Sequence, residues 1–350
     1  MNYLQYYGLS QEPFSNAPVS KFYFNSSQHA KALLRLQAVA EGMKGLGVLV
    51  GDIGAGKTTL ARRMLDQLPE DEYEAALLVI IHSGITAEWL LKRIASQLGV
   101  KTPADDKLTV LSQLYERLVE INKKGKKAIV LIDEAQMLQT RDIMEEFRGL
   151  LNLEIPGSKL ITFIFFGLPE LDQNLKLDEP LAGRIAMRYH LEPLNEEATT
   201  AYIDHRLRLS GCTKPLLLPD AIRVVHQYSH GIPRIINTIC DNALFEGSLT
   251  KQEQIGASLI RQIASDLGLD QTGQSPAAHA VPKPAGAPGL KAPPATPRLN
   301  VPPSRPPASQ PAAASHAAAP HKPTAKDEVT SLIGGAADDE IDDILGKIGT

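Results

Sequence analysis

A glycine-rich octapeptide at positions 51–58 holds the residues best suited to chemistry in this sequence. Its pattern, G-x-x-x-x-G-K-T, lets the backbone curl so that successive N–H groups point at the phosphates of a nucleotide. The Lys57 ammonium would reach the β- and γ-phosphates, and the Thr58 hydroxyl would be a ligand of Mg²⁺. The pattern therefore predicts a site for ATP and Mg²⁺. The residues expected to hold the nucleotide are Gly51, Asp52, Ile53, Gly54, Ala55, Gly56, Lys57, Thr58 and Thr59.

Two carboxylates close a second apolar run, at residues 126–134. Asp133 would hold Mg²⁺, directly or through a water molecule. Glu134 would act as a general base and polarise the water that attacks the γ-phosphate. The alternative is a strand that ends in a solvated acidic turn, but an apolar run closed by Asp-Glu after a phosphate loop is typical of a Walker B element.

The elements around these residues alternate between strand and helix. We expect strands at 46–50, 77–82, 128–132 and 160–166, and helices at 28–43, 57–68, 87–98, 107–123, 141–151 and 169–176. Strands separated by helices imply a mostly parallel sheet that is covered on both faces. The phosphate loop would then join a buried strand to a helix, whereas a glycine-rich turn without a ligand needs no such context.

The pattern becomes purely helical from about residue 195, with Pro and Gly breaks at 211–219 and 231–233. We therefore expect an α/β fold, a P-loop core with a parallel sheet flanked by helices, followed by a small all-α lid.

Composition limits the setting in which the chain acts. Its 350 residues carry a net charge of −4 and have a pI near 6.2, which gives no overall attraction to nucleic acid. Cys212 and Cys240 are in neither a C-x-x-C nor a metal-ligand spacing, so we expect a reducing compartment and no disulfide framework. The first residues lack an export signal, and no apolar run approaches the ~20 residues of a transmembrane segment. These features predict a cytoplasmic protein.

The last eighty residues have a different composition. Residues 271–326 hold 14 of the 25 prolines and no Asp or Glu, which predicts a disordered linker. Residues 327–350 carry seven acidic residues and one Lys. Within this tail Ile341, Ile344, Leu345 and Ile348 share one helical face, as in a docking peptide for a partner's groove. A solvated acidic tail without a partner is the alternative.

The chain resembles the AAA+ ATPases of the general secretion pathway protein A (ExeA) type, relatives of transposition ATPases, over roughly residues 1–268. In its first part the resemblance rests on residues 7–9, 12–15, 22–24 and 27–33. It implies that this region lies against the adenine, where apolar and aromatic side chains can stack on a base. Ordinary core packing is the alternative for these aromatics. For His29, a structural role and a nucleotide contact both remain open.

Later motifs of the family have counterparts here. Residues 167–171 read Gly-Leu-Pro-Glu-Leu, where the family usually has Gly-Gln-Pro-Glu-Leu and a polar residue acts as sensor 1. Leu168 replaces that polar residue and cannot form a side-chain hydrogen bond to a γ-phosphate or to water.

Two arginines gain roles from the same resemblance. Arg184 is the candidate arginine finger that reaches the γ-phosphate of a neighbouring subunit, with Arg188 as the second choice, and either could instead be a solvated helix cation. A finger of this kind implies a homo-oligomer. Arg234, in Gly-Ile-Pro-Arg at 231–234, matches sensor 2 and would touch the γ-phosphate in its own chain. Its alternative is an ion pair with a core carboxylate.

We expect five parts in the chain. They are an N-terminal segment that packs on the nucleotide site (1–45), an AAA+ α/β ATPase core (46–193), a helical lid (194–268), a Pro/Ala-rich disordered linker (269–326) and an acidic amphipathic tail (327–350).

Three functions compete. The leading hypothesis is an oligomeric ATPase that assists assembly of an envelope machine (a secretion system, a pilus or a polysaccharide exporter) and recruits an envelope-assembly protein through its tail. A DNA-linked ATPase of transposition or recombinase-loading type is the second, but residues 123–127 are the only basic cluster within 1–270, so DNA is not favoured. The third is a nucleotide-dependent switch with very slow turnover, which Leu168 supports.

Overall fold

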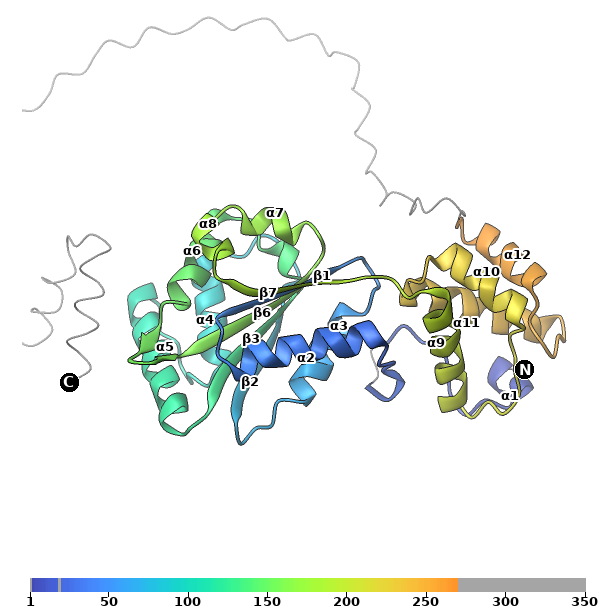
Figure 1. Ribbon diagram of the computed structural model, residues 1–350, viewed down its shortest axis with the longest axis horizontal. Helices are drawn as coiled ribbons and strands as arrows, with labels where there is room; N and C mark the ends of the chain where they lie inside the picture. Colours follow the sequence, from blue (N-terminus) through green and yellow to red (C-terminus); the bar gives the residue numbers. More distant parts are fainter. Residues whose placement is uncertain (1, 18–19, 270–350) are drawn as a thin grey trace, which may run out of the picture. The chain divides into compact units, whose positions relative to one another are not determined.

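The computed structural model describes residues 2–17 and 20–269 (Figure 1). The predicted linker from residue 270 on, and the acidic tail, lie outside the described residues. Five parallel strands form one sheet in this part of the chain, in the order β2-β3-β6-β1-β7. Their bounds are β1 Leu46–Gly51, β2 Tyr73–Val79, β3 Lys127–Asp133, β6 Ile161–Gly167 and β7 Ile185–Leu191.

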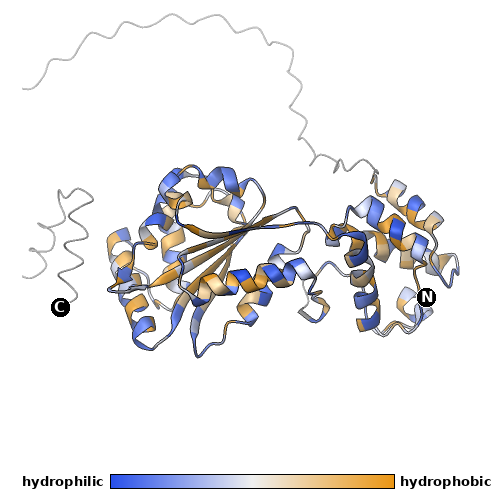
Figure 2. Ribbon diagram, in the orientation of Figure 1, coloured by the Kyte–Doolittle hydropathy of each residue, from blue (hydrophilic) through white to orange (hydrophobic). Residues whose placement is uncertain are grey.

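The three inner strands, β1, β3 and β6, are nearly continuous apolar runs that are buried along almost their whole length. Such runs are typical of parallel strands with both faces covered, and in Figure 2 these strands are coloured mostly as hydrophobic. Figure 1 shows helices on both faces of the sheet. The predicted α/β fold with a parallel sheet is therefore confirmed. The helices of this part are α2 Ser27–Glu41, α3 Lys57–Asp66, α4 Ala87–Gln97, α5 Lys107–Lys123, α6 Arg141–Leu150, α7 Leu171–Leu175 and α8 Glu179–Ala182, with a 3-10 turn η2 at Ala135–Met137 and a small hairpin of β4 (Glu154–Ile155) and β5 (Ser158–Lys159).

Each face of the sheet has its own hydrophobic cluster. On one face Phe147 of α6 packs edge-on against Phe163 and Phe165 of β6, with ring centroids 5.0 and 4.8 Å apart. On the other face Leu36 of α2 and Leu60 of α3 lie in one buried cluster with the alternate residues of β1, β3 and β6. This cluster therefore anchors α3, the helix that follows the phosphate loop, against the sheet.

Two strands differ from the prediction. The strand predicted at 77–82 lies at Tyr73–Val79, because its register on β3 runs from Tyr73 opposite Lys127 to Val79 opposite Asp133. The chain leaves the sheet soon after, and Ile81 is 80% exposed. Strand β7 was not predicted as an element. It is an edge strand in which Arg188 and His190 alternate with half-buried apolar residues, so its sequence lacks the long apolar run of an inner strand.

Four helices form the lid that we expected after residue 194, and they surround a separate buried cluster that includes Ile236, Ile239 and Leu244. They are α9 Glu196–Leu209, α10 Pro219–Ser229, α11 Pro233–Leu249 and α12 Ala257–Asp266. Both breaks that the sequence indicated, at 211–219 and 231–233, separate these helices.

The first residues of the chain pack on the lid. In helix α1 (Tyr3–Tyr7) the hydroxyl of Tyr3 donates to Asp241, and that of Tyr7 donates to the carbonyl of Gln252. Arg206 of α9 donates to the carbonyls of Pro13 and Ser15. The expectation that all of 1–45 packs on the nucleotide site is therefore too broad, because Leu9 and Phe14 are buried in the hydrophobic cluster of the lid and Tyr3, Leu4 and Tyr7 are partly buried against it. The short 3-10 turn η1 (Ser20–Phe22) and α2 follow. Among the described residues, no helix is both long and apolar enough to cross a bilayer.

Candidate functional site

The phosphate loop follows the inner strand β1 and ends at the first turn of α3. Gly54 and Gly56 have φ angles of 82° and 101°, in the left-handed region that favours glycine. A Cβ on Gly54 would lie 2.7 Å from the Cβ of Arg234, so this position needs glycine for space as well. No described side chain caps the N-terminus of α3, so its first N–H groups have no side-chain acceptor at the cap. These free donors and the helix dipole suit a phosphate.

Lys57 is the buried cation of the loop, with only 6% of its surface exposed. Its Nζ donates to the carbonyls of Gly51 at 2.9 Å and Asp52 at 2.8 Å. Burial lowers the pKa of Lys57, while the carboxylates of Glu134 and Asp133 oppose that shift. A phosphate at this place would give the ammonium an anionic partner, which the two neutral carbonyls do not.

Asp133 ends β3 beside the loop and is 1% exposed. One carboxylate oxygen accepts the backbone N–H of Glu134 at 3.0 Å, and the other has no hydrogen-bond partner among the described residues. Burial raises the pKa of Asp133, and the hydroxyl of Thr58 and the N–H of Glu134 oppose that rise. A buried carboxylate oxygen without a partner, beside a threonine hydroxyl, is the oxygen donor set that Mg²⁺ prefers. Asp133 and Thr58 thus fit the metal role predicted for them.

Glu134 sits just after the strand, in a left-handed conformation with φ of 56°. Its carboxylate accepts a 2.6 Å hydrogen bond from the side-chain amide of Gln136. Gln136 is a residue of the site that the sequence analysis missed. The only signal for it was its place three residues after Asp133, in Asp-Glu-Ala-Gln.

Lys57, Thr58, Glu134 and Gln136 line one cavity of about 450 Å³, whereas the buried Asp133 lies behind Thr58 and is not part of its lining. The volume falls within the usual range for small-molecule sites. Loop residues, Glu134 and Gln136 form one side, Pro233 and Arg234 come from the start of α11, and Leu168 comes from the end of β6. The leucine side chain stands where the family has its polar sensor. Other lining residues are Asn16, Phe22, Tyr202, Arg206 and Asn237.

Arg234 lies in the first turn of α11, after Pro233 at the helix start. Its backbone N–H contacts the carbonyl of Gly54 at 3.4 Å, and its side chain lines the cavity. It forms no ion pair within the part of the chain that the structure describes. The structure thus brings Arg234 to the loop and does not pair it with a core carboxylate.

His29 of helix α2 contacts the backbone of the phosphate loop. Its Nδ1 lies 2.7 Å from the hydroxyl oxygen of Ser26, and its Nε2 lies 3.3 Å from the carbonyl oxygen of Ala55. Because a carbonyl only accepts, the neutral ring with its proton on Nε2 satisfies the contact with Ala55. Burial lowers the pKa of His29, which favours this neutral form. The ring also lines a smaller cavity of about 60 Å³ with Phe22, Tyr23 and Phe24, so a nucleotide contact stays a prediction.

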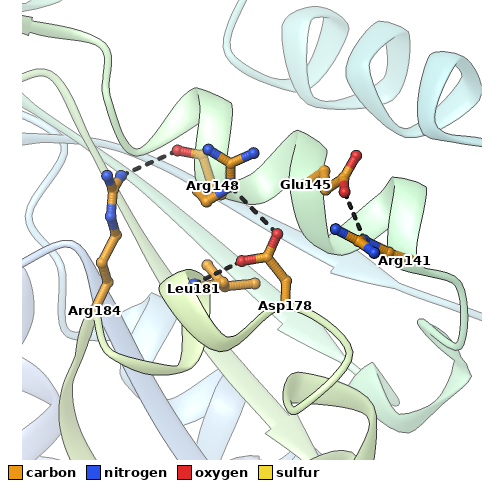
Figure 3. A network of polar contacts seen from close by, with 6 residues as sticks. All are labelled: Arg141, Glu145, Arg148, Asp178, Leu181 and Arg184. Atoms are coloured by element: carbon orange, nitrogen blue, oxygen red, sulfur yellow. Dashed lines mark hydrogen bonds and ion pairs between the residues drawn. The ribbon is translucent and has the colours of Figure 1, made fainter. Parts of the chain in front are cut away.

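The two remaining arginines, Arg184 and Arg188, lie elsewhere in the core, and Figure 3 shows the surroundings of Arg184. Arg184 donates to the backbone carbonyl of Arg148 at 3.1 Å, and the side chain of Arg148 in turn pairs with the buried Asp178 at 3.2 Å. Arg188 pairs with Asp172 at 3.2 Å. Neither Arg184 nor Arg188 lines the cavity of its own chain. Arg184 keeps a charge that no carboxylate neutralises among the described residues, whereas the charge of Arg188 is matched.

Comparison with known proteins agrees with this geometry. Residues 40–175 match a family described as an AAA domain. The chain is 39% identical over 245 residues to General secretion pathway protein A of Aeromonas hydrophila, a match that covers 69% of this chain and 44% of that relative. The chain therefore spans less than half the length of this curated relative.

Solved structures share the fold at low sequence identity. The ORC2 protein of Aeropyrum pernix has a TM-score of 0.55 at 15% identity, covering 73% of this chain and 72% of that one. Cdc6p of Pyrobaculum aerophilum has a TM-score of 0.56 at 16% identity, with 73% and 70% covered. A Walker-type ATPase of Pyrococcus abyssi has a TM-score of 0.53 at 20% identity, with 73% and 77% covered.

The parallel sheet, the phosphate loop after its inner strand β1 and the helical lid define an AAA+ protein of the P-loop class. Within that class, the chain belongs to the AAA+ ATPases of the general secretion pathway protein A type.

Proposed function

We propose that the chain binds ATP with Mg²⁺ and hydrolyses it, and that it works as an oligomer that assists the assembly of an envelope machine. The observation that carries the catalytic part is one cavity lined by Lys57, Glu134 and Arg234, which come from three separate elements.

The chain's own residues divide the work as follows. The N–H groups of the loop and the Lys57 ammonium hold the β- and γ-phosphates. Asp133 and Thr58 would hold Mg²⁺, which when bound offsets charge on the phosphate oxygens. Glu134 takes a proton from the attacking water while the oxygen of that water forms a bond to the γ-phosphorus. The bond between the γ-phosphorus and the β-γ bridging oxygen breaks, which leaves ADP and phosphate.

An oligomer would complete the site. Arg184 is held by the backbone carbonyl of Arg148 and does not reach the cavity of its own chain, which supports its use on a neighbouring copy. A guanidinium delivered this way stabilises negative charge in the transition state.

The envelope role is supported by the name of the relative that is 39% identical, General secretion pathway protein A. We further propose that the chain acts in the cytoplasm and that residues 327–350 recruit an envelope-assembly partner, for the reasons that the sequence provides.

A gene replacement tests this function. In the source organism, the wild-type chain is exchanged for Lys57→Ala, and both surface delivery of envelope assemblies and transposition frequency are measured. We expect a loss of surface delivery with unchanged transposition. The reverse pattern would replace the envelope role by the DNA-linked one.

A nucleotide-dependent switch with very slow turnover is the second candidate, favoured by Leu168 at the sensor position. Such a switch would bind ATP and change its lid without measurable release of phosphate, so a direct phosphate assay separates the two.

A further inference from the structure

Gln136 connects two parts of the candidate site that are otherwise separate. Its side-chain Nε2 donates to an oxygen of Glu134 at 2.6 Å, and its Oε1 accepts the backbone N–H of Leu168 at 3.1 Å. Only 6% of the Gln136 surface is exposed, so these bonds are shielded from competing water. One buried carboxamide therefore joins the end of β3 to the end of β6.

From this geometry we propose that Gln136 is the positioning residue of Glu134 and performs, through the backbone of Leu168, the sensing task that the leucine side chain cannot perform. This inference rests on the proposed ATP hydrolysis. Gln136 holds one oxygen of the Glu134 carboxylate and leaves the other for the attacking water. A shift of the loop after β6 moves the N–H of Leu168 and, through the carboxamide, reorients Glu134.

The surroundings of Gln136 fit this task. The side-chain amide of Asn174, in α7, donates to the backbone carbonyl of Gln136 at 2.8 Å. A Cβ on Gly167 would lie 3.2 Å from Oε1 of Gln136 and 2.9 Å from a methyl carbon of Leu171, so a glycine leaves room for the carboxamide. The turn that carries Gln136 is thus hydrogen-bonded both to Leu168, in the loop after β6, and to Asn174, in helix α7.

The chemistry of the side chain is specific. The position requires one donor towards Glu134 and one acceptor towards Leu168, and a carboxamide supplies both. An ionised carboxylate could only accept, and it would repel Glu134. An alkyl or thioether side chain of similar length fills the space and makes neither bond.

The test uses the full chain and compares Gln136→Met with the matched control Gln113→Met. We expect Gln136→Met to lower kcat by about 10- to 100-fold, because a misplaced catalytic group loses that much, with KM and the affinity for a fluorescent ATP analogue changed less than about twofold. Gln113→Met removes a carboxamide that also accepts one backbone N–H, from Ala104, and donates to one carbonyl, of Thr102, but it lies outside the cavity lining and should stay within about twofold of wild type. Thermal unfolding of both variants checks that the core is intact.

Two further readouts separate positioning from a structural role. In a Glu134→Gln background, Gln136→Met should have no added effect on the residual rate, since Gln136 acts through Glu134. Gln136→Glu should move the rising limb of the pH–rate profile to higher pH, because two adjacent carboxylates resist ionising together.

The outcomes are distinct. A wild-type kcat in Gln136→Met, a kcat above wild type, or an equal loss in Gln113→Met would each overturn the role of Gln136 while leaving ATP hydrolysis standing. Wild-type turnover no faster than that of Glu134→Gln would overturn the proposed function and this inference together.

Discussion

The nucleotide site and the segment around Arg184 both contain charged side chains with proposed roles in ATP hydrolysis. The two regions differ in whether these side chains have partners of opposite charge. In the nucleotide site, the Lys57 ammonium is buried against two carbonyls and one oxygen of Asp133 has no partner among the described residues. Around Arg184, two other arginines are already paired with carboxylates, Arg148 with Asp178 and Arg188 with Asp172.

This difference indicates how the work is divided. Buried charges without ionic partners cost free energy, and a ligand that supplies the counter-charge recovers it. The cavity is therefore built to receive a phosphate and a cation within one chain. The Arg184 segment holds one guanidinium in place, and under the proposed function a second copy would use it.

The largest effect is expected for Lys57→Ala, which removes the main phosphate cation. We expect the affinity for a fluorescent ATP analogue to fall by about 100-fold or more, since a charge-assisted contact in a buried site is lost. Titration followed by fluorescence anisotropy measures it. Affinity within a few fold of wild type would refute the assignment of the site.

Arg184→Ala tests the other half of the comparison. We expect kcat to fall by about 100-fold or more while the affinity for nucleotide stays near wild type, as for an arginine finger. Arg188→Ala is the matched control and should change kcat by less than about threefold, because the guanidinium of Arg188 is already paired with Asp172.

A mixing experiment shows whether Arg184 acts between copies. Neither Lys57→Ala nor Arg184→Ala alone should turn over ATP, but a mixture should, because an intact loop of one copy can meet an intact arginine of the other. Activity of the mixture no higher than the sum of the two alone would count against a finger in trans.

A smaller effect is expected from His29 as the pH is lowered. Burial lowers the pKa of His29 below its usual 6.5, so the unfolded chain binds more protons than the folded chain under acidic conditions. The contribution to the free energy of unfolding is thus present above pH 6.5 and is lost as the pH falls towards the folded pKa.

Thermal unfolding across this range measures it. We expect the wild type to lose stability below about pH 6.5 and His29→Gln to lose less. His205 and His226 have pKa values lowered by burial as well, so part of the dependence should remain in the variant. An identical pH dependence in both proteins would show that His29 does not contribute to the loss of stability at low pH.

The smallest effect is expected for truncation after residue 269. A Pro/Ala-rich segment does not add to a packed core, so the affinity for ATP and the unfolding temperature should stay within error of the full chain. Loss of folding in the truncated chain would show that the predicted boundary is misplaced.

Much of this arrangement was predictable from the sequence. The phosphate loop and the strand before Asp133 could be located because this glycine spacing and these unbroken apolar runs are compatible with few local structures. The lid helices were marked by Gly and Pro at their ends. These are local signals, and local signals were enough for the sheet core and for the loop.

What could not be predicted depends on tertiary contacts. The edge strand β7 carries Arg188 and His190 among apolar residues, so its pattern is weaker than that of an inner strand. The register of β2 is set by pairing with β3 and not by the most apolar stretch of its own sequence. Gln136 gains its place only because the ends of β3 and β6 lie side by side.

The most direct test of the central claim is phosphate release by the wild-type chain and by Glu134→Gln, each saturated with ATP and Mg²⁺. The substitution preserves the size of the side chain and removes the base. We expect both proteins to bind nucleotide with similar affinity and the wild type to release phosphate about 100-fold faster. Equal rates in the two proteins would contradict the claim that this cavity hydrolyses ATP.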